Sequence, residues 1–320
     1  MLRHLFIVDP LPLLNVEKDT TIALMREAAR RGHEVFSAEV DQLSVGEAGR
    51  PLGLAVPTQL CEGDPWYETG ASLFVPLHEF DVVWMRKDPP YTIDYFWATH
   101  LLSLVPSPTL LVNDPQGLRE VAEKFFSLRF PDLCPESLVS CRIDELLAFR
   151  NKLGGEMVIK PLGGAGGQGV FHLSPNDRNV NAILEIATRN GQEYQLAQRY
   201  LPEVRQGDKR IILLEDEPIG AVLRVPHQTE TRANLHVGGM AVKTELGPRD
   251  LEICARIGPA LAQAGILFSG IDVIGDWLTE VNVTSPTGVR EINALEGVAL
   301  EEPVLDLVER RSKERRSRGA

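Results

Sequence analysis

Residues 270–284 read Gly270-Ile271-Asp272-Val273-Ile274-Gly275-Asp276-Trp277-Leu278-Thr279-Glu280-Val281-Asn282-Val283-Thr284, the most informative stretch of the chain. Two short apolar runs flank Gly275-Asp276, which predicts a β-hairpin. Alternate residues of a strand face the same side, so we expect Glu280 and Asn282 to share a face and Asp272 to approach them. Two carboxylates and an amide oxygen are ligands that Mg²⁺ accepts, together with water and substrate phosphates. The stretch therefore predicts a metal site made by Asp272, Glu280 and Asn282, and it points to nucleotide chemistry.

A glycine-rich loop lies about a hundred residues earlier and reads Lys160-Pro161-Leu162-Gly163-Gly164-Ala165-Gly166-Gly167-Gln168-Gly169. It matches GxGxxG, but a dinucleotide fingerprint needs a following helix, and the apolar run 170–173 predicts a strand instead. No Gly-Lys-Ser/Thr closes the loop, so it is not a Walker motif. We expect a strand–loop–strand flap whose backbone N–H groups face phosphate oxygens, with Lys160 adding a positive charge. Taken alone, the loop is equally compatible with a surface turn; the predicted metal site favours phosphate binding.

Further charged positions need an explanation. Arg86 and Lys87 directly follow an apolar strand, where open α/β sheets bind ligands; a solvated loop is the alternative. Arg210 begins another apolar run, and Arg224 lies within one, so it needs a partner if it is buried. The polar stretch 229–239 ends in a glycine pair and has the character of a lid. Zinc is not expected, because no histidine pair has ligand spacing, and no Ser/His/Asp triad can be assembled.

Composition narrows the class of protein. The chain has 320 residues, a formal charge of −12 and a hydrophobic content of 43%, which fits a globular protein of two or three domains and disfavours a nucleic-acid binder. No apolar run is long enough to span a membrane, and the N-terminus predicts a β-strand rather than a signal peptide. The cysteines show no metal-type spacing, which is typical of reduced cytoplasmic thiols. They are Cys61, Cys134, Cys141 and Cys254.

The pattern of elements changes along the chain. The first third alternates strand and helix signals, which predicts an α/β domain with a mostly parallel sheet. Within it, residues 41–78 are rich in glycine, proline and polar side chains and predict a long loop region. From about residue 124 the strands come in hairpin-like pairs, which predicts an α+β, partly antiparallel architecture. The mixed-charge tail 310–320 predicts a solvated helix end that becomes disordered; RNA binding by this tail is a less favoured alternative.

These features together resemble the bacterial-type glutathione synthetases, which have the ATP-grasp fold, and the resemblance extends to about residue 309. The runs that carry it are Asn15–Asp19, Met85–Pro90, Asn113–Gln116, Ile159–Leu162 with the glycine loop, Gln198–Pro202, Gly207–Arg210, 230–239 and Leu278–Thr287. Two positions depart from the family pattern: Gly163 stands where an acidic residue is frequent, and Met240 where a basic one is frequent.

The resemblance implies an α/β N-terminal domain with a parallel sheet over residues 1–123, followed by a two-lobed ATP-grasp fold. The lid domain would span residues 124–204 and the catalytic domain residues 205–309. It also implies a cytoplasmic homo-oligomer, a dimer or tetramer, with no nucleic acid or membrane partner. The activity implied is an ATP- and Mg²⁺-dependent ligase, with Mn²⁺ as a substitute, that joins γ-glutamylcysteine and glycine through an acyl-phosphate.

The resemblance also implies roles for individual residues. Metal ions would bind Asp272, Glu280 and Asn282. The nucleotide would contact Lys124, Lys160, Gly164, Gly166, Gly167, Gln198, Tyr200, Leu201, Asp208 and Arg210. Arg210, Arg232 and Asn234 would be catalytic, and the substrates would contact Lys18, Arg86, Lys87, Asn282 and Ser285. Two alternatives remain at this stage: another ATP-grasp carboxylate–amine ligase, of the glutamate-adding or D-alanine type, and a non-catalytic nucleotide sensor.

Overall fold

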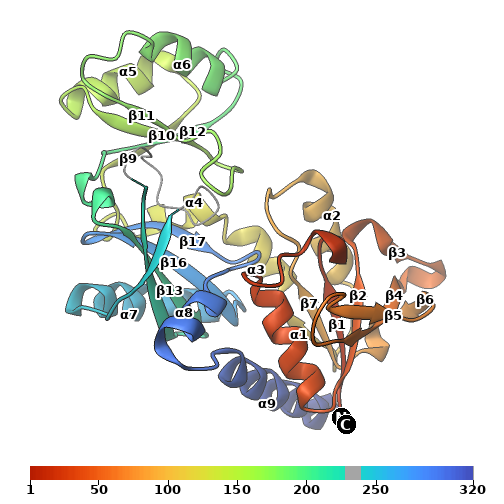
Figure 1. Ribbon diagram of the computed structural model, residues 1–320. Helices are drawn as coiled ribbons and strands as arrows, with labels where there is room; N and C mark the ends of the chain where they lie inside the picture. Colours follow the sequence, from red (N-terminus) through yellow and green to blue (C-terminus); the bar gives the residue numbers. More distant parts are fainter. Residues whose placement is uncertain (228–238, 320) are drawn as a thin grey trace.

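Three β-sheets organise the computed structural model, which describes residues 1–227 and 239–319 (Figure 1). The N-terminal sheet has the strand order β3-β4-β2-β1-β7-β8; strands β2, β1, β7 and β8 run parallel to one another, whereas β4 pairs with β2 antiparallel. These strands are β1 (Arg3–Ile7), β2 (Glu34–Ala38), β7 (Val82–Met85) and β8 (Leu110–Val112), and the helices that connect them are α1 (Thr20–Arg30) and α2 (Ile93–Leu102). The predicted parallel α/β domain is confirmed.

The prediction of a long loop over residues 41–78 is wrong, because most of this segment is β-structure. It contains β3 (Leu43–Val45), β4 (Pro51–Leu60), β5 (Tyr67–Thr69) and β6 (Leu73–Pro76). Glycine and proline conceal the strand pattern in β4, where Pro51, Gly53 and Ala55 form the buried face. Gly53 is needed for packing, since a Cβ there would lie 3.1 Å from Leu77 Cδ2. Tertiary packing therefore overrides the local turn signals.

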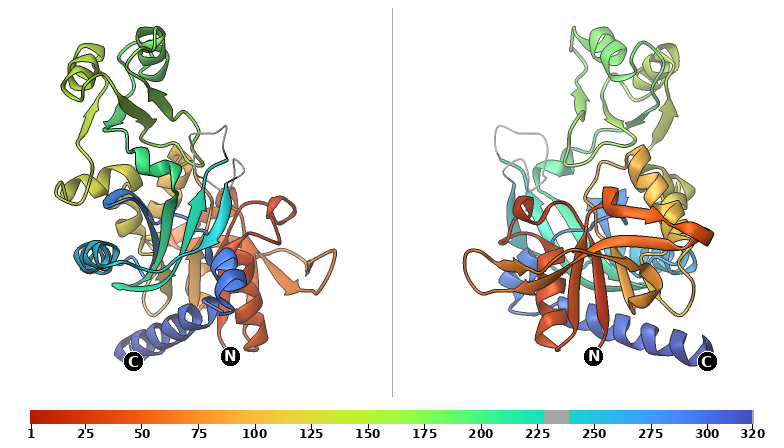
Figure 2. Two further views of the ribbon diagram at one scale, coloured as in Figure 1. Left: turned by 60° about the vertical axis from the view of Figure 1, so that its left-hand side comes forward. Right: turned by 90° about the vertical axis from the view of Figure 1, so that its right-hand side faces the viewer.

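A separate lobe carries the second sheet, which is antiparallel and ordered β11-β10-β12-β9. Its elements are β9 (Ser137–Ser140), α5 (Ile143–Lys152), β10 (Met157–Pro161), β11 (Phe171–Leu173), α6 (Val180–Ala187) and β12 (Gln195–Gln198). The lobe has its own core, built around Leu146, Met157 and Leu173. Figure 2 shows it standing apart from the rest of the molecule.

The third sheet is antiparallel and ordered β15-β14-β13-β16-β17. Its strands are β13 (Asp208–Leu214), β14 (Glu217–Val225), β15 (Met240–Lys243), β16 (Phe268–Ile274) and β17 (Trp277–Asn282). Helices α7 (Pro248–Gln263) and α8 (Val289–Glu296) cover opposite faces, because Ile211 packs with α7 residues and its neighbour Ile212 with α8 residues. The predicted α+β second part of the chain is confirmed.

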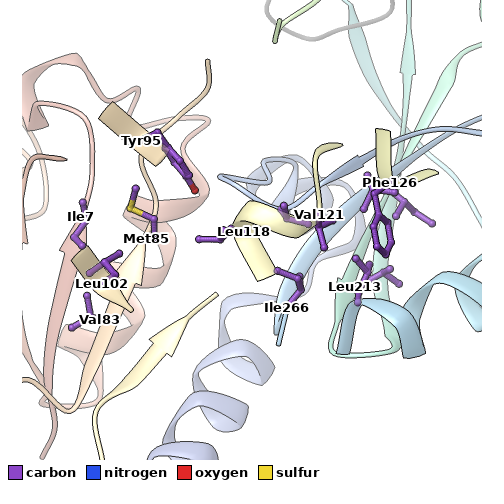
Figure 3. Packing of buried hydrophobic residues seen from close by; sticks show 14 of the residues in the cluster. Ile7, Val83, Met85, Tyr95, Leu102, Leu118, Val121, Phe126, Leu213 and Ile266 are labelled. Carbon is purple, nitrogen blue, oxygen red and sulfur yellow. The ribbon is translucent and has the colours of Figure 1, made fainter. Parts of the chain in front are cut away.

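Two short helices join the N-terminal domain to the five-stranded sheet: α3 (Pro115–Glu120) and α4 (Glu123–Phe126). Figure 3 shows Leu118 lying between Met85 of the N-terminal sheet and Ile266 before β16, with Val121 farther along toward Phe126. Only glycine fits at Gly117, since a Cβ there would lie 2.0 Å from the Ala264 carbonyl oxygen. This continuous core fixes how the first domain faces the third sheet.

The predicted disorder of the tail 310–320 is wrong for residues 310–319, which continue helix α9 (Glu301–Gly319). Val304, Leu305 and Val308 form its buried apolar stripe. The charged end is held by ion pairs from Arg311 to Glu215 and from Arg316 to Asp81. The charges thus have partners that are distant in sequence, which the mixed-charge pattern does not reveal.

Helix α9 lies against α1 and β8 along the base of the molecule (Figure 2). Arg31 at the end of α1 pairs with Asp306 at 2.7 Å and with Glu309 at 2.9 Å. The domain limits predicted from the sequence stay a prediction, since α9 packs on the first domain although it follows the third sheet. Among the described residues, no helix is long and apolar enough to cross a membrane.

Candidate active site

The predicted hairpin is confirmed: β16 and β17 are antiparallel, and Asp272 is the cross-strand neighbour of Glu280. Gly275 makes the turn with a φ of +57°, a conformation that favours glycine. The Asn282 amide Nδ2 donates to Asp272 Oδ2 over 3.3 Å. The structure thus brings the three predicted metal ligands together, while their role as ligands remains a prediction.

Two guanidinium groups surround the Asp272 carboxylate, which is buried. Arg210 Nε lies 2.5 Å from Oδ1, and Arg224 Nη2 lies 2.9 Å from Oδ2. Burial alone would raise the pKa of Asp272, but the two arginines outweigh it and hold the pKa well below its usual range. The two arginines therefore favour the ionised form of Asp272. The sequence-based expectation that Arg224 needs a partner is confirmed.

Glu280 connects the hairpin to the glycine flap through a lysine. Lys124 Nζ lies 2.8 Å from Glu280 Oε1 and also donates to the Gly164 carbonyl oxygen of the flap. Lys124 is buried, so the pair forms in a poorly solvated position where charges interact strongly. The flap itself joins β10 to β11, as predicted, and Gly164 is tightly packed because a Cβ there would lie 2.6 Å from Pro161 Cγ.

A cavity of about 950 Å³ opens between the lobe and the five-stranded sheet. Most of the predicted nucleotide contacts line it: Lys124, Lys160, Gly164, Gly166, Gly167, Gln198, Tyr200, Leu201 and Asp208. Inside it, Lys160 Nζ donates to Gln198 Oε1 over 2.8 Å. Burial lowers the pKa of Lys160, although nearby carboxylates oppose the shift. A half-buried ammonium whose hydrogen-bond partner among the described residues is a neutral amide is suited to an anionic ligand.

Part of the wall of this cavity is apolar and comes from both sheets. Val158, Leu201 and Ile274 line it, and so do His172 and Tyr200, whose rings stack with centroids 3.9 Å apart. His172 is fixed by Glu156, 2.8 Å from its Nε2. An apolar wall with two stacked rings fits a planar heterocycle such as a purine base.

Asp208 supplies an unsatisfied acceptor in the wall of the same cavity. Its Oδ2 accepts from Arg224 Nη2 over 2.6 Å, but Oδ1 is buried without a hydrogen-bond partner among the described residues. Burial raises the pKa of Asp208 to about 6, because Arg224 is shared with Asp272 and compensates only in part. A buried acceptor of this kind is suited to a ligand hydroxyl group.

A second cavity, of about 2330 Å³, adjoins the first on the side of the N-terminal domain. The predicted substrate contacts Lys18, Asn282 and Ser285 line it, and Arg210 does too. Glu280 and the flap residues 164–166 line both cavities. A group held in the first cavity can therefore meet one held in the second beside Glu280.

The other predicted substrate contacts lie elsewhere. Arg86 is 4% exposed, donates to Thr21 Oγ1 and to the Pro286 carbonyl oxygen, and lies over the Phe268 ring. Lys87 pairs with Asp9 at 2.7 Å and lines a third cavity near α2. Neither side chain lines the second cavity, so the geometry does not support their predicted contact with substrate. Arg232 and Asn234 lie outside the described residues.

Sequence reasoning missed five carboxylates of the second cavity: Asp9, Asp19, Asp88, Glu123 and Glu291. Glu123 Oε1 accepts from Thr284 Oγ1 over 2.8 Å and from the Val283 and Thr284 amides over 3.3 and 3.4 Å. It thereby holds the segment that directly follows Asn282. Burial raises the pKa of Asp88, and the Ser285 side chain donates to its carboxylate. Of these carboxylates, only Glu123 has a local sequence signal for a role in the site, because it directly precedes Lys124, a predicted nucleotide contact.

The donor set fits a hard divalent cation. Among residues 1–227 and 239–319, no cluster of three His, Cys, Asp or Glu side chains could hold a metal. The fit therefore depends on the Asn282 amide oxygen joining the Asp272 and Glu280 carboxylates, and an all-oxygen set suits Mg²⁺ or Mn²⁺ rather than zinc.

Comparisons with known proteins agree with this geometry. Residues 2–119 match the family model "Prokaryotic glutathione synthetase, N-terminal domain", and residues 123–297 match its ATP-grasp domain. Among curated relatives, the glutathione synthetase of Gloeobacter violaceus is 50% identical, over 95% of this chain and 96% of that protein. The glutathione synthetase of Brucella melitensis is 45% identical, over 95% of this chain and 97% of that protein.

Solved structures with low sequence identity share the fold. D-cycloserine synthetase DcsG superposes with a TM-score of 0.69 at 14% identity, covering 96% of this chain and 99% of that one. The ATP-grasp ligase PsnB gives a TM-score of 0.62 at 17% identity, covering 96% and 98%. The architecture is thus an ATP-grasp fold. Because both domain models and relatives of up to 50% identity cover nearly the whole sequence, the chain belongs to the prokaryotic glutathione synthetase family.

Proposed function

We propose that the chain is an ATP-dependent ligase that joins γ-glutamylcysteine to glycine and so makes glutathione. Membership of the family and the ATP-grasp fold support this proposal. The single observation that carries it is the meeting of the first cavity, lined by Lys124, Lys160 and the flap, with the larger charged cavity at Glu280 and the glycine flap. A phosphoryl group crossing this junction would pass from the nucleotide to the substrate carboxylate.

The chemistry requires such a junction, because a free carboxylate is a poor electrophile. Its phosphorylation by ATP gives an acyl-phosphate, from which the glycine amine displaces phosphate. Phosphoryl transfer depends on positioning and on neutralising charge rather than on covalent help from the protein. Magnesium, or manganese in its place, would neutralise phosphate charge when bound by Asp272, Glu280 and Asn282.

The nucleotide contacts follow from the lining of the first cavity. Lys124 and Lys160 would bind phosphate oxygens, and Gly164, Gly166 and Gly167 would let backbone amides approach them. Gln198, Tyr200 and Leu201 would border the base, and Asp208 would accept from the ribose.

The substrate side uses the second cavity. Arg210 would stabilise the phosphoryl group in transit, and Lys18 and Ser285 would contact the acceptor. Arg232 and Asn234 would close over the intermediate and keep water out.

We further propose a cytoplasmic homo-oligomer, a dimer or tetramer, with lobe limits at residues 124–204 and 205–309. All four cysteines are free, which suits a reducing compartment. Light scattering on the purified chain measures the oligomeric state.

The decisive experiment is phosphate release from ATP against a panel of acids and amines. Release should require both γ-glutamylcysteine and glycine, and mass spectrometry should identify glutathione. Higher activity with another acid–amine pair, such as a D-alanine pair, would assign the chain to a neighbouring ligase. ATP binding without turnover of any pair would indicate a sensor.

A further inference from the structure

Glu291 is an unexplained carboxylate in the wall of the second cavity. It lies in the first turn of α8, and its Oε2 is buried without a hydrogen-bond partner among the described residues. A buried acceptor without a donor costs free energy unless a ligand or water satisfies it.

The ordinary role of a carboxylate in this position is helix capping. A glutamate at the third helical position usually accepts from the backbone N–H of the residue that precedes the helix, which here is Gly288. Among the described residues no such bond is formed by Glu291. Capping therefore leaves the unpaired oxygen unexplained.

Six carboxylates line this cavity, and five of them are engaged. Asp9 pairs with Lys87, Asp19 caps α1, Asp88 accepts from Ser285, Glu123 accepts from Thr284, and Glu280 pairs with Lys124. Glu291 is thus the one carboxylate of the set without a partner among the described residues.

A cation lies at the same end of the cavity. Arg290 Nε donates to the Glu17 carbonyl oxygen over 3.5 Å, which ties the start of α8 to the loop that carries Lys18. Lys18 is exposed and lines the cavity together with Glu291. An ammonium and a carboxylate in the wall of one cavity complement a ligand that carries the opposite pair of charges.

We propose that Glu291 binds the α-ammonium of the γ-glutamyl group of the acceptor substrate, with Lys18 facing its α-carboxylate. This inference rests on the proposed function. The carboxylate that accepts the phosphoryl group must lie beside Asn282 and Arg210, so the far end of the dipeptide extends across the cavity. Its zwitterionic amino-acid end then meets Lys18 and Glu291. Among the described residues that line the cavity, these are the only two side chains of opposite charge that are not already paired.

The test compares two substrates in one variant. Glu291→Gln keeps the size of the side chain and removes its charge. The substrates are γ-glutamylcysteine and glutarylcysteine, which differ only in the α-amino group. For γ-glutamylcysteine, kcat/KM should fall about 10- to 100-fold, mostly through KM, as expected for a lost charge-assisted hydrogen bond. For glutarylcysteine it should change less than about threefold, because the lost partner is absent already.

A matched control is Glu296→Gln at the other end of α8, where the carboxylate pairs with Lys243 at 2.5 Å and lines none of the cavities described. It should leave both values of kcat/KM unchanged. Equal losses with the two substrates in Glu291→Gln would indicate a structural role and overturn the inference, and so would no loss with either. If the native chain turns over another acid–amine pair and ignores γ-glutamylcysteine, the proposed function fails as well, which distinguishes the two failures.

Discussion

Asp272 and Arg210 form a bidentate ion pair, with Arg210 Nε 2.5 Å from Oδ1 and Nη2 3.0 Å from Oδ2. A divalent cation that binds Asp272 must compete with this guanidinium for the same oxygens. Asp272 would hold the cation, and Arg210 lines the second cavity beside it. The predicted metal site and the predicted catalytic arginine therefore share one carboxylate.

Asp272→Asn should lower ligase activity at least about 100-fold, because it removes a metal ligand and the acceptor shared by Arg210 and Arg224. It should also lower the free energy of unfolding by about 3 kcal/mol, since it leaves two buried guanidiniums with one fewer carboxylate. Urea denaturation and steady-state assays measure the two effects. Asp276→Asn, in the exposed turn of the same hairpin, should change neither. Native-like activity in Asp272→Asn would contradict the metal assignment.

Glu280→Ala should abolish product formation while the fold is retained. The variant loses a proposed metal ligand, and among the described residues it leaves Lys124 with the Gly164 carbonyl oxygen as its partner. The Mg²⁺ concentration for half-maximal rate should rise at least about tenfold if any activity remains. Glu252→Ala on α7 removes an exposed carboxylate and serves as the control. Unchanged turnover at ordinary Mg²⁺ would remove Glu280 from the metal site.

Glu123→Ala should weaken catalysis through the position of Asn282, because three donors of residues 283–284 lose their acceptor. We expect kcat to fall about 10- to 100-fold and the Mg²⁺ requirement to rise. Glu123→Gln keeps an acceptor oxygen and should restore most of the activity. Equal losses in the two variants would show instead that the charge of Glu123 is what matters.

Glu27→Gln tests the contact between α1 and α9 through its pH dependence. Hydrogen bonds from Arg30 and Arg31 lower the pKa of the buried Glu27 carboxyl in the folded protein. A lowered folded-state pKa gives stability that is present above the unfolded-state pKa and is lost as the pH falls through the folded-state value. Near pH 7 the variant should be less stable by about 2 kcal/mol, and this difference should shrink steadily below about pH 4.5.

Chemical denaturation at a series of pH values measures this difference. Glu34→Gln, which breaks a more exposed pair with Arg3, should cost less than about 1 kcal/mol at any pH. A destabilisation by Glu27→Gln that stays constant down to pH 3 would rule out the ion pairs as its cause.

Local sequence patterns were sufficient to predict the β16–β17 hairpin and the glycine flap. In both, apolar runs, a turn and the chemistry-bearing residues lie within about fifteen positions, so sequence spacing determines what meets. Arg224 could be read in the same way, because an arginine inside an apolar strand must find a counter-charge.

Other features depend on neighbours that are distant in sequence. The rule that ligands bind at the ends of parallel strands correctly placed Arg86 near the edge of the sheet that faces the site. It did not predict where the Arg86 side chain points, because contacts with Thr21, Pro286 and the Phe268 ring determine this. The contacts of Glu123 and Glu291 likewise depend on segments that are distant in sequence and pack against them in the folded chain. Helix α9 looked like a solvated tail because its partners, Arg31 and Glu215, come far earlier in the chain.

The contact between α1 and α9 has a consequence for biosynthesis. Arg30 and Glu302, which pair at 3.2 Å, are separated by 272 positions, so α1 emerges from the ribosome long before its partner exists. Until α9 has been translated, the apolar face that Val304, Leu305 and Val308 later cover stays open to chaperones or to other nascent chains. The first domain to be synthesised is therefore among the last to bury all of its apolar surface.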